Sequence, residues 1–261
     1  MKPDKFELES LLAFAVTLAR GAGEITLKHF RRSFTPDRKA DGSFVTAADR
    51  EAERFIRVGI AEKFPHDSIL GEEEGAHTGS SGRRWIIDPI DGTYSFVHGV
   101  PLYGVMIALE IAEESYLGVV NLPALGDLVC AARTLGCFWN ERTARVSATA
   151  TLEEALLLAT DFGTCERYNF GAAARRLEER AGARRTWGDC YGHVLVATGR
   201  AEVMLDPVMN VWDCAALQPI VEEAGGTFTD WRGRRTIHGG NAISTNGALL
   251  RPVLDVIEQE T

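Results

Sequence analysis

Cysteine is scarce in this chain of 261 residues, and the five cysteines form no Cys-x-x-Cys pair. An odd number of scattered thiols argues against a disulfide framework or a zinc knuckle and suits a reducing compartment. No uninterrupted apolar run approaches the roughly 20 residues that span a bilayer, and residues 1–10 are mostly polar and charged. We therefore expect a soluble cytoplasmic protein with no signal peptide and no membrane partner.

Basic side chains are also in deficit, since 28 Lys and Arg stand against 37 Asp and Glu, for a formal net charge of -9. This charge repels nucleic acid overall, and the arginine clusters are short and scattered, so we expect no nucleic-acid partner. An acidic protein that acts on an anionic substrate must reverse its charge locally. Bound divalent cations do this, because they are the largest local charges wherever they bind.

The pattern of apolar residues predicts an α/β (α+β) chain. Apolar positions recur at helical spacing in residues 6–32, and a second helix is expected after Asp49. Apolar runs separated by turn residues predict consecutive strands at 68–70, 85–87, 103–111, 117–122 and 128–132. After residue 146, short apolar runs alternate with helical patterns, as in an α/β lobe. We predict two lobes, residues 1–145 and 146–261.

Two carboxylates three residues apart are the most informative feature of the chain. They lie in Trp85-Ile86-Ile87-Asp88-Pro89-Ile90-Asp91-Gly92-Thr93, where an apolar run enters a turn. A rigid pair of Asp side chains at a strand end suits Mg²⁺, which prefers oxygen ligands. Gly92 and Thr93 then begin a possible helix, whose free backbone N–H groups attract an anion. The segment therefore predicts metal and phosphate binding within one loop.

Three further acidic residues, Asp49, Glu72 and Asp213, each follow an apolar or β-branched run and stand beside a turn or a helix start. In α/β folds, sites gather at such strand ends. Each residue also has a purely structural interpretation. Asp49 and Asp213 could cap helices, and Glu72 could be a solvated loop charge.

Taken together, these segments resemble the inositol-monophosphatase superfamily of magnesium-dependent, lithium-sensitive phosphatases. The resemblance rests on residues 45–49, 71–73, 85–93, 212–213, 222–226 and 242–246, in the order of the superfamily. It implies a layered αβαβα sandwich of the inositol-monophosphatase and fructose-1,6-bisphosphatase type. It also implies a homodimer, with metal ions held between the two lobes of each subunit.

The same resemblance assigns a metal site with two or three Mg²⁺ ions, or Mn²⁺ in their place. Glu72, Asp88 and the carbonyl of Ile90 would hold the first ion, and Asp88, Asp91 and Asp213 would hold the second. Two ions about 3.5 to 4 Å apart stabilise both the attacking and the leaving oxygen of an in-line displacement. The implied reaction is the hydrolysis of a phosphate monoester.

The resemblance also implies roles for groups beside the metals. Thr93 would hydrogen-bond both the attacking water and Asp49, and Glu72 would orient or deprotonate that water. Backbone N–H groups of Gly92 and Thr93 would bind the phosphate. Phosphoryl transfer needs mainly positioning and charge neutralisation, so these parts form a complete site without a covalent nucleophile.

Substrate choice is expected to depend on residues 187–192 and 205–213, where the chain departs from inositol enzymes. Asp189 and the bulky Tyr191 replace a stretch of small residues there, and the added negative charge suits a cationic substrate. Asp206 matches the position that reads the alcohol part of the substrate, and a carboxylate accepts from an ammonium or a hydroxyl.

With residues 91–97 and 99–104, these segments resemble the histidinol-phosphatase branch, which removes phosphate from L-histidinol phosphate in histidine biosynthesis. That resemblance implies that Asp189 and Asp206 bind the cation and that Tyr191 or Trp187 bounds the imidazole ring.

Two other hypotheses remain open at this point. One is the same chemistry on an inositol, sugar or nucleotide phosphate, and the other is a non-catalytic sensor of metal or anion. His193 is interpreted as a packed or partly exposed side chain and not as a ligand, because no second His or Cys stands at metal-ligand spacing. His98 and Lys39 receive no role.

Overall fold

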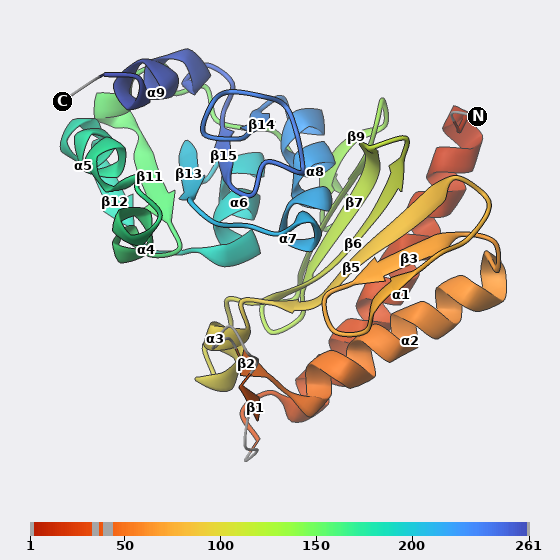
Figure 1. The fold of residues 1–261 in the computed structure, drawn as a ribbon. Coiled ribbons are helices and arrows are strands. Elements are labelled where there is room, and N and C mark those ends of the chain that lie inside the picture. The colour runs from red at the N-terminus through yellow and green to blue at the C-terminus, as the bar shows by residue number, and fades with distance from the viewer. Residues whose placement is uncertain (1–2, 33–36, 39–43, 260–261) are drawn as a thin grey trace.

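The structure is a computed structural model that describes residues 3–32, 37–38 and 44–259. Two large sheets and three layers of helices alternate through the molecule (Figure 1). The larger sheet contains β3 (Ser68–Gly71), β4 (Gly75–His77), β5 (Arg83–Asp91), β6 (Gly104–Ile111), β7 (Glu114–Leu122), β8 (Asp127–Ala132), β9 (Gly136–Trp139) and β10 (Arg142–Thr143). Its order is β10-β9-β8-β7-β6-β5-β3-β4, and β3 and β5 are its parallel pair. The five predicted strands of this region are confirmed.

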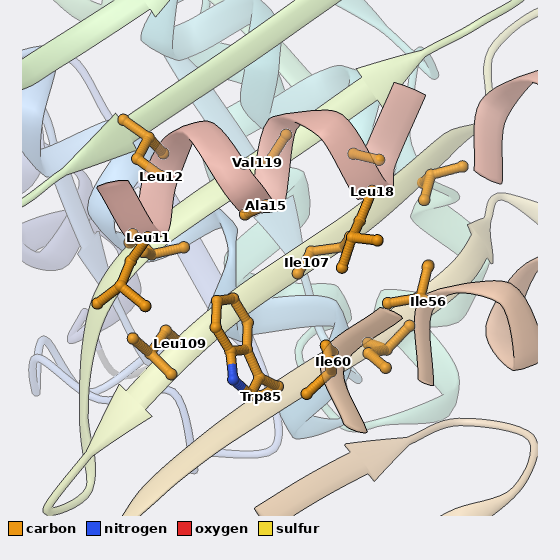
Figure 2. Packing of buried hydrophobic residues seen from close by; sticks show 14 of the residues in the cluster. Leu11, Leu12, Ala15, Leu18, Ile56, Ile60, Trp85, Ile107, Leu109 and Val119 are labelled. Carbon is orange, nitrogen blue, oxygen red and sulfur yellow. The ribbon is translucent and has the colours of Figure 1, made fainter. Parts of the chain in front are cut away.

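Helices α1 (Lys5–His29) and α2 (Ala47–Lys63) cover the outer face of this sheet. Figure 2 shows side chains of both helices around Trp85, which is fully buried and packs edge-on against Phe14. By length and composition alone α1 could cross a membrane. Its apolar face instead packs on the sheet, with Leu11 and Ala15 fully or nearly fully buried, as in the core helix of a globular domain.

A middle layer of three helices separates the two sheets: α6 (Asp189–Ala197), α7 (Val211–Ala215) and α8 (Leu217–Glu223). Leu217 and Ile220 of α8 pack against Val120 of β7. At Gly118 the backbone of the middle layer comes so close that a Cβ would lie 2.0 Å from the carbonyl oxygen of Ala216. On the other side, Leu195 of α6 packs against the second sheet.

The second sheet contains β11 (Leu156–Ala159), β12 (Ala183–Arg185), β13 (Val203–Asp206), β14 (Thr227–Thr229) and β15 (Ala242–Thr245), in the order β12-β11-β13-β15-β14. Its outer face carries α4 (Phe162–Arg167), α5 (Gly171–Arg180) and α9 (Leu250–Ile257). The remaining elements are β1 (Asp37–Arg38), β2 (Phe44–Val45), α3 (Thr93–Val97) and the 3-10 turn Leu152–Glu154. The predicted layered αβαβα sandwich is confirmed. The division into lobes near residue 145 stays a prediction, although the two sheets fall on either side of it.

Candidate active site

The end of β5 presents Asp88 and Asp91 at an irregular turn. The pairing of β5 with β6 shifts register between these two residues, where Pro89 cannot donate a ladder hydrogen bond. The Asp88 carboxylate accepts the backbone N–H of Ile90 at 3.0 Å. Gly92 follows with a φ of 83°, and a Cβ there would lie 2.9 Å from the Leu102 carbonyl oxygen. The sequence therefore needs glycine here to turn from β5 into α3.

Asp213 comes to the same place from a distant part of the chain. It lies in the first turn of α7, where its carboxylate accepts the backbone N–H of Asn210 at 2.6 Å. Helix α7 packs on β5 and β6. Asp88, Asp91 and Asp213 consequently each offer a carboxylate oxygen within 4.8 Å of the others. The structure thus brings these three predicted metal ligands together.

Glu72 follows β3, and β3 runs parallel to β5, so the carboxyl ends of the two strands meet. The backbone N–H of Glu72 donates to the carbonyl of Ile87 at 3.2 Å, which places Glu72 beside Asp88 in the sheet register. Burial raises the pKa of Asp88 well above its ordinary value, and the negative charge of Glu72 raises it further. The fourth predicted carboxylate therefore lies within electrostatic reach of the other three.

Asp49 is the third residue of α2 and forms a capping box with the N-cap residue Thr46. Its Oδ2 accepts the N–H and the hydroxyl of Thr46 at 2.8 and 2.5 Å. Its Oδ1 is buried and has no hydrogen-bond partner among the described residues. Burial raises the pKa of Asp49 to about 7. A buried carboxylate oxygen without a partner fits a site that a cation or a water molecule completes.

Thr93 is the first residue of α3. Its hydroxyl donates to the carbonyl of Ile90 at 3.0 Å, and not to Asp49, in the described part of the chain. The predicted Thr93–Asp49 hydrogen bond is therefore not formed, and the hydroxyl bonds instead to a carbonyl three residues back in the same turn. Ile90 is buried, and its carbonyl oxygen keeps a second lone pair.

Burial and, after it, repulsion between neighbouring carboxylates raise the pKa values of this cluster. Burial raises the pKa of Asp91 well above its ordinary value and that of Asp213 to about 7, and neighbouring carboxylates add to both shifts. Oxygen donors alone, with excess negative charge, form the ligand set that hard divalent cations prefer. These residues therefore fit a metal site of the predicted kind.

A cavity of about 230 Å³ adjoins the cluster. Its lining contains four carboxylates and, among the described residues, no basic side chain: it consists of Asp91, Thr160, Thr164, Asp189, Asp206, Pro207, Val208, Met209 and Asp213. Asp189 begins α6 with a φ of 52°, and its backbone N–H donates to the Thr160 hydroxyl at 2.8 Å. Such a conformation in a residue other than glycine is often part of a functional site. The predicted pair Asp189 and Asp206 thus lines one cavity.

Tyr191 and Trp187 do not line this cavity. The ring of Tyr191 packs against apolar side chains of the middle layer and the second sheet. Trp187 is exposed, and the Arg185 guanidinium lies 6.0 Å from its ring centre. Residues that are two positions apart on a helix point to different faces, so the Tyr191 side chain cannot point in the same direction as that of Asp189. The ring contact expected of Tyr191 or Trp187 finds no support in this arrangement.

Comparison with known proteins identifies the family. Residues 7–258 match the model of the inositol monophosphatase family. The chain belongs to this family. It is 50% identical over 248 residues to a protein of Chlorobaculum parvum named histidinol-phosphatase, with 94% of this chain and 96% of the relative covered. A Mycobacterium tuberculosis protein of the same name is 39% identical, with 93% and 96% covered.

Solved structures agree with this membership. An inositol monophosphatase from Zymomonas mobilis superposes with a TM-score of 0.87 at 30% identity, covering 98% of this chain and all of that one. The extragenic suppressor protein suhB of Bartonella henselae gives a TM-score of 0.90 at 28% identity, over 97% and 100% of the two chains. Enzymes of this family use metal ions, in keeping with the acidic cluster.

Glu53 supports the loop beside the site, and no sequence motif points to it. It is fully buried on α2 and accepts the backbone N–H groups of Glu73 and Glu74 at 2.8 and 3.0 Å, and Arg57 Nε at 2.7 Å. It therefore anchors the loop that begins with Glu72. Its spacing of four residues from Asp49, on the same helical face, is the one sequence signal for it.

The residues without an assigned role have varied surroundings. His98 donates from Nδ1 to the Tyr94 carbonyl at 2.8 Å and stacks on the Tyr94 ring at 4.5 Å. His193 is fully buried, in keeping with the interpretation of a packed side chain. Lys39 lies outside the described residues.

Proposed function

We propose that this chain is a metal-dependent phosphomonoesterase that hydrolyses L-histidinol phosphate to L-histidinol and phosphate, as a step of histidine biosynthesis. The observation that carries this proposal is the cavity beside the acidic cluster, where Asp189 and Asp206 add negative charge beyond Asp88, Asp91 and Asp213. A neutral alcohol needs no such charge, whereas histidinol carries an ammonium group. Two relatives at 50% and 39% identity are named histidinol-phosphatase, which supports the same substrate.

The resident metal of this proposal is Mg²⁺, two or three ions per site, with Mn²⁺ as a possible substitute. Glu72, Asp88, Asp91, Asp213 and the Ile90 carbonyl would hold it. When bound, it supplies charge neutralisation for the phosphate and a lowered pKa for water. The arrangement of these residues from three different segments leaves the excess negative charge that such ions require.

The chain's own groups then position the reacting parts. Backbone N–H groups of Gly92 and Thr93 open α3 and have no acceptor within that helix, so they are assigned to the phosphate oxygens. Glu72 orients the attacking water or accepts its proton. Asp49, with its unpartnered Oδ1, and the Thr93 hydroxyl are assigned to the same water. Asp189 and Asp206 hold the ammonium group of the alcohol.

A second substrate class deserves a test because a specific relative favours it. A Thermotoga maritima protein named fructose-1,6-bisphosphatase/inositol-1-monophosphatase is 36% identical over 253 residues. Asp206 can accept a hydrogen bond from a hydroxyl as well as from an ammonium.

We also propose that the protein is a homodimer in the cytoplasm, without a nucleic-acid or membrane partner. This part of the proposal rests on the family resemblance and on the composition alone.

The experiment that tests the substrate is a panel of phosphate monoesters with added Mg²⁺. We expect kcat/KM for L-histidinol phosphate to exceed that for inositol 1-phosphate by at least about tenfold, the order of one hydrogen bond to a charged group. Phosphate release should stop in EDTA. Equal kcat/KM for the two esters would remove histidinol phosphate as the substrate, and release that persists in EDTA would remove the metal.

Stability without metal is expected to fall as the pH rises from about 4 to about 7. The pKa values of Asp49, Asp189 and Asp213 are raised from 3.8 to about 7 in the folded protein. In this window the folded state holds more protons than the unfolded state, so raising the pH favours unfolding. Mg²⁺ should restore stability near pH 7.5 and have little effect near pH 5, where protons compete with it.

The measurement is the melting temperature in EDTA and in Mg²⁺ at both pH values. A metal-induced rise of the same size at pH 5 and pH 7.5 would show that the protonation of Asp213 and the carboxylates around it is not linked to binding of the ion.

A further inference from the structure

Behind the cavity, one buried histidine joins two strands of the second sheet. His193 Nε2 lies 3.1 Å from Oδ2 of Asp206 at the end of β13, and Nδ1 lies 2.6 Å from the Ser244 hydroxyl on β15. His193 and Ser244 are fully buried, and the Asp206 side chain is 8% exposed. The imidazole therefore has a defined partner on each nitrogen.

The nature of these partners determines where one hydrogen of the His193 ring lies. An ionised carboxylate can only accept a hydrogen bond, so Nε2 of His193 carries a hydrogen and donates it to Asp206. Ser244 can donate to Nδ1 or accept from it, and so satisfies either state of the ring. Two hydrogen bonds and the Phe228 ring, with its centroid 5.8 Å away, hold the imidazole in one orientation.

Helix α6 couples this histidine to the proposed recognition pair. Asp189 and His193 are four residues apart on α6, so they share one face of the helix. Asp189 lines the cavity, and His193 contacts Asp206, which lines it too. The backbone of Asp206 is held as well, because its carbonyl accepts the Trp231 indole N–H at 3.0 Å. Because the backbone of Asp206 is held in this way, the direction of its carboxylate depends on the hydrogen bond to His193.

We propose that His193 is a positioning residue for substrate selectivity, which holds Oδ2 of Asp206 so that the carboxylate faces the alcohol part of the substrate. This inference rests on the proposed function only in taking Asp206 to read the alcohol. A histidine with a purely structural role would also need partners for its buried ring nitrogens, but its replacement by phenylalanine, which has a similar shape, would leave the selectivity unchanged.

The test compares His193→Phe with the wild-type enzyme on L-histidinol phosphate and on phenyl phosphate, which has no ammonium or hydroxyl to read. Selectivity is the ratio of the two kcat/KM values in Mg²⁺. We expect this ratio to fall about tenfold or more, the effect of losing a hydrogen bond to a charged group. The loss should come mainly from a higher KM for L-histidinol phosphate.

A second pair of variants separates hydrogen bonding from folding. In His193→Gln the amide nitrogen can occupy the place of Nε2 and still donate to Asp206, whereas in His193→Asn the shorter amide reaches only toward Ser244. Both remove the ring, so a structural role predicts similar selectivity for both. Positioning predicts that the glutamine variant recovers most of the ratio and that the asparagine variant does not, even if the phenylalanine variant fails to fold.

The outcomes also distinguish this inference from the proposed substrate. A wild-type enzyme that prefers inositol 1-phosphate would refute histidinol phosphate, and the same ratio taken with inositol 1-phosphate would then test His193. An unchanged ratio in His193→Phe, or equal ratios in the glutamine and asparagine variants, would overturn the inference whichever alcohol is preferred.

Discussion

Replacement of Asp88 by asparagine is expected to lower kcat/KM for phosphate release by about a thousandfold, a loss of the order seen when a group that stabilises charge in a transition state is removed. Asp88 is the most buried member of the triad that it forms with Asp91 and Asp213. It is also the residue assigned to both metal ions. Asparagine has the same shape and can still accept the Ile90 N–H, so the change removes the charge with little change in geometry.

Stability measurements show whether the loss is one of metal binding. Asp88→Asn removes a buried charge that its neighbours repel, so the metal-free melting temperature should rise and the stabilisation by Mg²⁺ should shrink. The matched control is Asp255→Asn, an exposed position on α9 far from the site in sequence. Full activity in Asp88→Asn, or an undiminished response to Mg²⁺, would contradict the assignment of Asp88 as a metal ligand.

The second large effect is expected at Asp189. Asp189→Asn should lower kcat/KM for L-histidinol phosphate about ten- to a hundredfold, because it removes a partly buried charge assigned to the ammonium group. Asparagine tolerates the φ of 52° as aspartate does, so the start of α6 should keep its shape. The loss on inositol 1-phosphate should be smaller, because that substrate has no ammonium group.

A control for charge alone is Asp161→Asn, which removes one exposed carboxylate a few residues from the cavity lining. Asparagine can still accept the Gly163 N–H that Asp161 accepts at 3.0 Å. If Asp161→Asn lowers kcat/KM as much as Asp189→Asn does, the effect is a general one of net charge. If Asp189→Asn loses activity equally on both esters, it does not recognise the cation.

Much of the fold was predictable because it follows from local patterns of apolar residues in the sequence. The strands of the larger sheet are continuous apolar runs, since both faces of this sheet are covered by helices. The apolar run of β5 ends at Asp88, and Gly92 forms the turn that follows, so the position of these carboxylates could be inferred from the sequence. Their approach to Asp213, more than a hundred residues later, was predictable only through the family resemblance.

Side-chain direction on α6 was not predictable in the same way. This helix lies between two sheets and is buried over most of its length, from Cys190 to Ala197, so apolar periodicity does not distinguish its faces. The sequence therefore did not show that Tyr191 packs against apolar side chains or that His193 contacts Asp206. Glu53 was missed for another reason, since its partners are backbone N–H groups, which no side-chain motif records.

The most direct test of the whole account is a crystal soaked with Mn²⁺ and L-histidinol and measured at the manganese absorption edge. We predict anomalous peaks in contact with Asp88, Asp91 and Asp213, and the ammonium group of histidinol within hydrogen-bond distance of Asp189 or Asp206. Manganese bound elsewhere, or histidinol bound away from both aspartates, would contradict it.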